Sequence, residues 1–151
     1  MKFTELKTPC YVIDEQKLIK NLEILKSVQD RTGCKILLAQ KAFSAFCVYP
    51  LMSKYLSGTT ASGLYEAKLG HECFGKETHI FAPAFKENDF EEILKICGHI
   101  VFNSFSQLEK YRDKWQNADV SVGIRLNPEF STQEGLSLIH ISEPTRPISI
   151  S

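Results

Sequence analysis

The sequence lacks long hydrophobic runs, an excess of charge of one sign and a signal-peptide pattern. No apolar stretch in its 151 residues approaches the ~20 that a membrane-spanning helix needs, and residues 1–5 have no apolar core. Lys plus Arg and Asp plus Glu both number 18, so no basic surface for nucleic acid and no charge bias toward a membrane is predicted. We therefore expect a cytoplasmic protein that binds neither nucleic acid nor membrane.

Cysteine pairs and nucleotide-binding motifs are also missing. The five cysteines form no CxxC pair and predict no disulfide framework. His71-Glu72-Cys73 are neighbours that would not share a helix face, so we expect no metal site. The chain contains neither GxGxxG nor GxxxxGK[ST], which leaves the usual nucleotide-binding α/β sheets unsupported.

What the chain does contain is a regular alternation of helical and strand patterns. Its hydrophobic fraction of 43% is enough for one domain with a core. Helices are predicted from an Asp14 cap to Gly33, through 48–52, at 64–69 with Gly70 as the stop, at 88–96 and at 104–114; strands are predicted at 8–13, 35–39, 58–61, 78–81, 100–102 and 120–126. This order predicts parallel βαβ units and, without a nucleotide motif, a (β/α) TIM barrel.

Three residues at predicted strand ends are candidates for chemistry, because barrel enzymes place catalytic residues there. Lys41 follows the apolar run 36–40, where a partly desolvated amine is a nucleophile suited to Schiff-base formation. Ser62 follows the next strand, and Arg125 lies in the last. Each has a plainer interpretation: Lys41 extends to solvent, Ser62 caps the helix near Leu64, and Arg125 pairs with a surface carboxylate.

Four segments carry a family resemblance: Thr8–Asp14, Leu38–Ser44, Thr60–Gly70 and Val122–Glu129. From Thr8 to about Gly135 the chain resembles the amino-terminal half of the carboxynorspermidine decarboxylases, which belong to the alanine racemase-type pyridoxal-phosphate barrels. Ornithine- and diaminopimelate-type relatives usually carry an acidic residue where this chain has Thr59 and Thr60, which favours the carboxynorspermidine branch. Gln40 departs from the residue usual at its position in many members.

The resemblance implies a cofactor, pyridoxal 5'-phosphate, and a reaction. Lys41 would be the Schiff-base lysine, Ser62 would lie beside the cofactor, and Arg125 would approach its ring. The full-length enzyme would be a homodimer that decarboxylates carboxynorspermidine or carboxyspermidine to norspermidine or spermidine in polyamine biosynthesis. Two alternatives remain: a non-catalytic pyridoxal-phosphate carrier with the same barrel, and an α/β scaffold domain in which Lys41 is incidental.

The same resemblance divides the chain into three parts. Residues 1–13 would be a strand segment that joins a carboxyl-terminal β-domain, and 14–135 would be a partial barrel. The family's ring-stacking histidine, glycine-rich phosphate loop and acidic partner of the pyridine nitrogen come later than these residues, so we expect the chain itself to be inactive. Leu136–Arg146 reads as the translation of a transposase-type sequencing adapter, and 136–151 are therefore expected to be a non-native tail.

Overall fold

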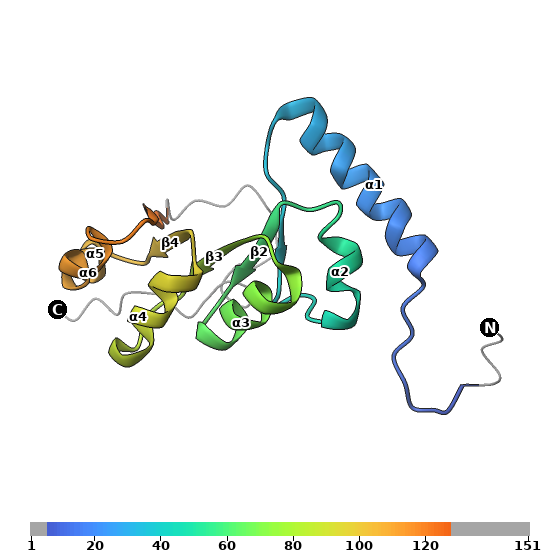
Figure 1. Ribbon diagram of the computed structural model, residues 1–151, viewed down its shortest axis with the longest axis horizontal. Coiled ribbons are helices and arrows are strands. Elements are labelled where there is room, and N and C mark those ends of the chain that lie inside the picture. The colour runs from blue at the N-terminus through green and yellow to red at the C-terminus, as the bar shows by residue number, and fades with distance from the viewer. Residues whose placement is uncertain (1–5, 128–151) are drawn as a thin grey trace.

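The computed structural model describes residues 6–127, which alternate between parallel strands and helices (Figure 1). The strands are β1 Leu37–Ala39, β2 Gly58–Ala61, β3 Glu77–Phe81, β4 His99–Phe102 and β5 Ser121–Ile124. The α-helices are α1 Glu15–Thr32, α2 Tyr49–Met52, α3 Leu64–Leu69, α4 Glu87–Ile96, α5 Phe105–Lys110 and α6 Arg112–Trp115; η2 Phe46–Val48 is a 3-10 turn and η3 Gly70–Phe74 is a π-helical turn. The predicted α/β class is confirmed.

The strands form one sheet in the order β1-β2-β3-β4-β5, and each is parallel to its neighbour. The order follows the sequence without a reversal, unlike doubly wound nucleotide-binding sheets, where it reverses at a switch point. Successive strands are joined through helices, and α2, α3 and α4 follow one another along the sheet in Figure 1. Every strand therefore ends at the same edge of the sheet.

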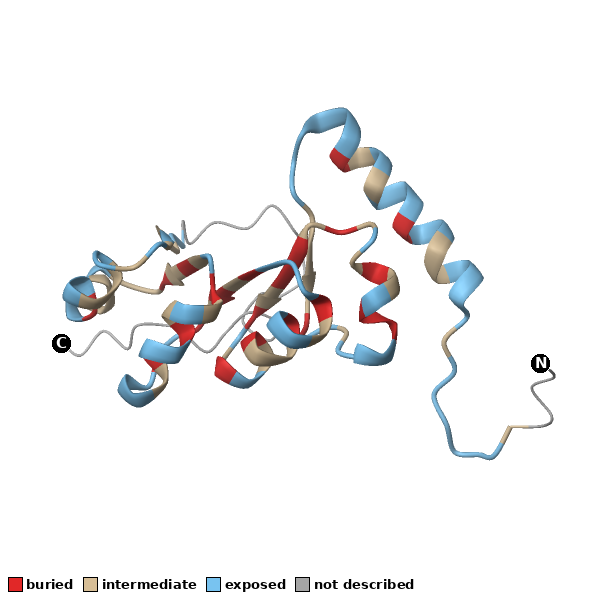
Figure 2. Ribbon diagram, viewed as in Figure 1, coloured by how far each residue is buried: buried red, intermediate tan, exposed pale blue. Residues whose placement is uncertain are grey.

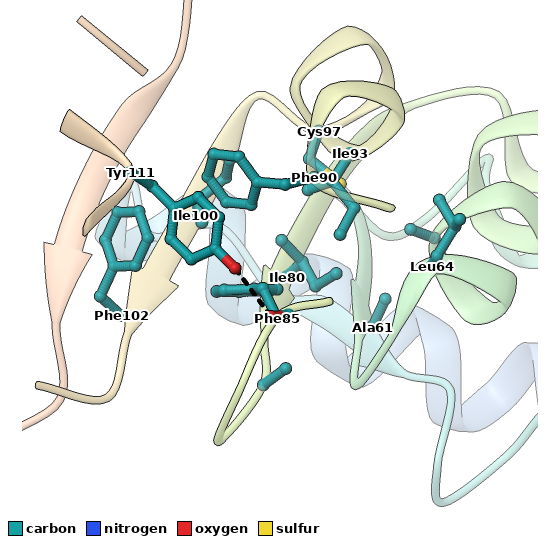
Figure 3. Close-up of a cluster of buried hydrophobic side chains, with 12 residues drawn as sticks. Ala61, Leu64, Ile80, Phe85, Phe90, Ile93, Cys97, Ile100, Phe102 and Tyr111 are labelled. Carbon is teal, nitrogen blue, oxygen red and sulfur yellow. Dashed lines mark hydrogen bonds between the residues drawn. The ribbon is translucent and has the colours of Figure 1, made fainter. Parts of the chain in front are cut away.

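The helices pack on one face of the sheet. Ile80 of β3 and Ile100 of β4 are lateral partners, and both are buried in a cluster with Leu64 of α3 and Phe90 of α4 (Figure 3). Buried residues occur on β2, β3 and β4 and on α2, α3 and α4, whereas most of α1 is exposed (Figure 2). Tyr111 joins the same cluster from the segment between α5 and α6. Strand residues alternate between faces, so the neighbours of Ile80 and Ile100 in each strand lie on the opposite face. That second face, which we call the open face, carries half-buried side chains such as His79, His99 and Val101.

Local signals placed α1 correctly. The Asp14 side chain accepts a hydrogen bond from the Lys17 N–H at 3.1 Å and begins the helix, as predicted. Gly33 has a left-handed φ of 72° and ends it, also as predicted. Leu22 packs α1 against the second buried cluster, which includes Tyr49 and Met52 of α2.

Several other predicted boundaries differ from the observed ones. Gly70 continues α3 into η3, and the left-handed residue that ends this helical run is Gly75, with a φ of 71°. The helix predicted over 104–114 is interrupted at Tyr111, because that side chain is buried and its hydroxyl donates to the Phe85 carbonyl at 2.8 Å. Arg125 follows β5 instead of lying within it, and residues 6–13 form no assigned strand; that 1–13 join a β-domain stays a prediction.

Candidate active site

The carboxyl-terminal edge of the sheet brings the predicted site residues onto one side of the molecule. Lys41 follows β1 by two residues, Ser62 follows β2 directly, and Arg125 follows β5 directly. Because β1 and β2 are neighbours, Lys41 and Ser62 lie at adjacent strand ends. Arg125 lies across the sheet, beyond β3 and β4.

Lys41 lies in a tight turn that continues β1. The Gln40 N–H donates to the Thr60 carbonyl at 3.2 Å, one residue beyond the regular β1–β2 pairing. The Ala42 and Phe43 N–H groups both donate to the Ala39 carbonyl, at 3.0 and 3.2 Å, and close the turn around Lys41. Lys41 itself is exposed, whereas we expected a partly desolvated amine. Within residues 6–127 the helices cover only the face of the sheet opposite the open face. No other element therefore covers the open face and excludes water from the end of β1.

Ser62 is exposed, and it does not cap α3 through its hydroxyl. The N-cap residue of α3 is Gly63, which supplies no side-chain cap. Instead the Ser62 N–H donates to Oε2 of Glu66 at 2.7 Å, so the Glu66 carboxylate stabilises the amino-terminal end of the helix.

Arg125 contacts the ends of two neighbouring strands, β4 and β3. Its backbone N–H donates to the Phe102 carbonyl at 2.9 Å, which extends the β4–β5 pairing. Its Nη1 donates to Oδ1 of Asn103 at 3.4 Å, and its guanidinium carbon lies 5.5 Å from the centroid of the Phe81 ring, a cation–π distance. Sequence reasoning missed Asn103 and Phe81, although Asn103 directly follows a predicted strand and Phe81 ends one.

Sequence reasoning also missed a buried polar pair, Gln40 and Tyr49, directly beside Lys41. Gln40 is 1% exposed; its Nε2 donates to the Glu66 carbonyl at 2.8 Å, and its Oε1 accepts from the Tyr49 hydroxyl at 3.4 Å. Burial, and next the Glu66 and Cys73 charges, raise the pKa of Tyr49, which keeps the phenol protonated as a donor. The sequence did contain a signal for this pair. Gln40 lies two residues after Leu38 and so shares its helix-facing side of the strand, where a glutamine needs hydrogen-bond partners from the packed helices.

A second polar group lies on the open face, toward the amino-terminal half of the strands. Lys35 pairs with Glu77, Oε2 of Glu77 lies 3.2 Å from Nε2 of His79, and the His79 and His99 rings are 5.0 Å apart. Hydrogen bonds from Lys35 and then His79 lower the pKa of Glu77. Burial, and then the His79 charge, lower the pKa of His99. Among residues 6–127 no three His, Cys, Asp or Glu side chains are grouped as a metal site, and no helix is long and apolar enough to cross a membrane.

Comparison with known proteins identifies relatives of one chemical type. No family model matches the chain. It is 40% identical over 144 residues to a carboxynorspermidine/carboxyspermidine decarboxylase of Herminiimonas arsenicoxydans, a match that covers 95% of this chain and 38% of that protein. It is 44% identical over 131 residues to the protein of the same name in Campylobacter jejuni, covering 87% and 34%. It is 38% identical over 130 residues to a carboxyaminopropylagmatine decarboxylase of Synechocystis, covering 86% and 34%.

A solved structure agrees with these relatives. The crystal structure of carboxynorspermidine decarboxylase complexed with norspermidine from Campylobacter jejuni matches with a TM-score of 0.81 and 45% identity, over 83% of this chain and 34% of that one. Only 135 residues precede Leu136, so the 144-residue match to the Herminiimonas protein extends into residues 136–151. The Campylobacter and Synechocystis matches, over 131 and 130 residues, are short enough to end before Leu136. Residues 136–151 lie outside the described residues. The resemblance read from the sequence is confirmed: this chain is a homologue of the carboxynorspermidine/carboxyspermidine decarboxylases and spans about a third of their length.

Proposed function

We propose that this chain is part of a pyridoxal-phosphate-dependent decarboxylase that converts carboxynorspermidine or carboxyspermidine to norspermidine or spermidine in polyamine biosynthesis. The observation that carries the proposal is the position of Lys41 two residues after β1, at the sheet edge shared with Ser62 and Arg125, in a chain 44% identical to such an enzyme. The names of the relatives share a carboxylated polyamine-type substrate, which supports this substrate class.

The residues at the strand ends fit the cofactor in charge and chemistry. Pyridoxal phosphate carries an aldehyde, a phosphate and a phenolate, and when bound it supplies a ring that accepts electrons as carbon dioxide leaves. The Lys41 amine would hold the aldehyde covalently. Ser62 would donate a hydrogen bond from its hydroxyl. The Arg125 guanidinium, oriented by Phe81 and Asn103, would offer a fixed positive charge to the phenolate side of the ring.

The rest of the architecture follows from this family assignment. We infer that residues 14–135 are the first part of a TIM barrel, which further strands would close over the open face, and that 1–13 join a β-domain supplied by later sequence. The complete enzyme would be a cytoplasmic homodimer. Residues 136–151 would be a foreign tail, and the 151-residue chain alone would be inactive, since the later cofactor ligands of the family are missing from it.

Covalent trapping tests the role of Lys41. A chain extended to the length of its relatives is mixed with pyridoxal phosphate and reduced with borohydride, and the labelled peptides are identified by mass spectrometry. We expect the label at Lys41, and Lys41→Ala should lose both label and carbon dioxide release. Lys54→Ala, which removes another exposed lysine, is the control and should retain both. Labelling without carbon dioxide release would favour the carrier, and absence of a specific label would favour the scaffold.

The tail is tested at the level of the gene. An uninterrupted read of the source locus past Gly135 should show a continuing reading frame in place of Leu136–Ser151. A locus that encodes Leu136–Ser151 as written would contradict the assignment of a foreign tail.

A further inference from the structure

Gln40 has no part in the proposed chemistry, yet it is one of the most buried polar side chains of the described residues. It directly precedes the exposed Lys41, so burial changes from nearly complete to exposed between two consecutive residues. A buried amide is costly unless it is hydrogen-bonded. Here the amide is bonded at both ends, by α3 through the Glu66 carbonyl at 2.8 Å and by α2 through the Tyr49 hydroxyl at 3.4 Å.

Tyr49 contacts the Lys41 turn on both sides. Its hydroxyl lies 3.4 Å from Oε1 of Gln40, before the lysine, and 3.4 Å from the carbonyl of Phe43, after it. The Tyr49 ring is fully buried and packs edge-on against Phe74 of η3, with centroids 5.5 Å apart. Both hydroxyl distances are long for an O–H donor, so the 2.8 Å bond from Gln40 to Glu66 is the stronger connection.

Glu66 extends this connection to Ser62. Its backbone carbonyl accepts from Gln40, and its carboxylate accepts from the Ser62 N–H at 2.7 Å. A Cβ on Gly70 would lie 2.3 Å from Oγ1 of Thr59 and 2.9 Å from Nε2 of Gln40, so only glycine allows η3 to approach this closely. One residue of α3 therefore holds the ends of β1 and β2, and the Gln40 amide has little room for another position.

We propose that Gln40 is a positioning residue for Lys41: through Glu66 and Tyr49 it fixes the turn after β1, and so fixes the backbone from which the lysine amine extends toward the carboxyl-terminal edge. The role of Lys41 as cofactor-binding amine rests on the proposed function, whereas the anchoring of the turn rests on the contacts above. An anchored backbone reduces the number of positions that a long, flexible lysine side chain samples.

The chain offers a matched control in Gln29. It is a second buried glutamine, 9% exposed, and it anchors the opposite end of β1: Nε2 donates to the Tyr55 carbonyl at 2.7 Å, and Oε1 accepts from the Ile36 N–H at 2.8 Å. Gln40→Leu and Gln29→Leu each remove a buried, hydrogen-bonded amide, and Gln29→Leu also removes the acceptor of the Ser57 hydroxyl at 2.7 Å. They differ in which end of β1 is released.

Amide hydrogen exchange of the 151-residue chain, resolved to single residues, tests the anchor without any cofactor. Gln40→Leu should accelerate exchange of the Ala42 and Phe43 amides by about fivefold relative to Ser57, which corresponds to the loss of one buried hydrogen bond. Gln29→Leu should instead accelerate Ile36 and Ser57 relative to Ala42. Equal acceleration at both ends of β1 in each variant would overturn the proposal. So would a parent chain in which the Ala42 and Phe43 amides exchange as freely as in an unfolded chain.

A second readout connects the anchor to the amine. In the chain extended to its relatives' length, the share of borohydride-fixed pyridoxal label found at Lys41 should fall about fivefold in Gln40→Leu and stay within about twofold of the parent in Gln29→Leu. If the share of label at Lys41 falls equally in Gln40→Leu and Gln29→Leu, the role of Gln40 is only structural, and the proposal that it positions Lys41 is refuted. If the parent itself is not labelled at Lys41, the proposed function fails, while the exchange result still decides whether Gln40 anchors the turn.

Discussion

Phe90→Ala should remove a large part of the stability of this chain. Phe90 is 0% exposed and lies at the centre of four packed aromatic rings. Its ring stacks on Tyr111 at 4.0 Å between centroids and contacts Phe85 at 5.5 Å and Phe102 at 6.1 Å (Figure 3). These rings join α4 to β4 and to the α5–α6 segment, so truncation leaves a cavity where three elements meet.

The expected loss is about 3–5 kcal/mol, the range for truncating a fully buried phenylalanine, where lost transfer energy and the residual cavity add. Because a domain is normally stable by only about 5–15 kcal/mol, the variant would be close to unfolding under ordinary conditions. Phe105→Ala is the control: Phe105 is 69% exposed at the start of α5, and its removal should change the unfolding free energy by no more than about 0.5 kcal/mol.

Urea unfolding measures both variants. Trp115 is the single tryptophan, and it packs against the cluster that contains Phe90, so its fluorescence reports the transition. Titrations at one low protein concentration would keep association constant across the variants. A Phe90→Ala loss no larger than that of Phe105→Ala would refute the aromatic cluster as the main core of residues 6–127.

Three further predictions concern other parts of the fold. Burial raises the pKa of Cys97 to about 12, so iodoacetamide at about pH 8 should alkylate the exposed Cys10, Cys34 and Cys47 and spare Cys97 in the folded chain; equal modification by mass spectrometry would contradict this. The lowered pKa of His99 means that the unfolded state binds its proton more readily, so its contribution to stability is present above about pH 6.5 and is lost as the pH falls through the folded-state pKa. His99→Leu should therefore lose less unfolding free energy than the parent between about pH 7 and pH 5, and parallel urea titrations with identical losses would count against it. Finally, β1 and β5 each pair with one strand within residues 6–127, and these open edges should make the 151-residue chain associate. Light scattering that shows a monomer at every concentration would be the opposite result.

Much of the fold could be predicted because its signals are local. Asp14 and Gly33 mark the ends of α1 within a few residues of the helix they cap, and β2 over 58–61 was predicted with its observed bounds. The alternation of strands and helices placed Lys41 and Ser62 beyond neighbouring strands, because parallel strands all end at one edge. The barrel itself and the roles of these residues stay predictions, since they depend on strands and ligands beyond this third of the relatives' length.

The sequence by itself determined the order of the elements, the first helix and the resemblance to the decarboxylases, all of which depend on nearby residues or on short motifs. Only the tertiary structure decided which side chains hold the site. Gln40 meets Glu66 across 26 positions and Arg125 meets Asn103 across 22, so neither pair leaves a local pattern. Gly70 and Tyr111 show the same limit. Gly70 packs closely on Thr59 and does not end the helix as its sequence position indicates, and the hydrogen bond from Tyr111 to Phe85 accompanies a break in a helix predicted to be continuous. The physical reason is that a buried polar group must find its partner wherever the folded chain supplies one.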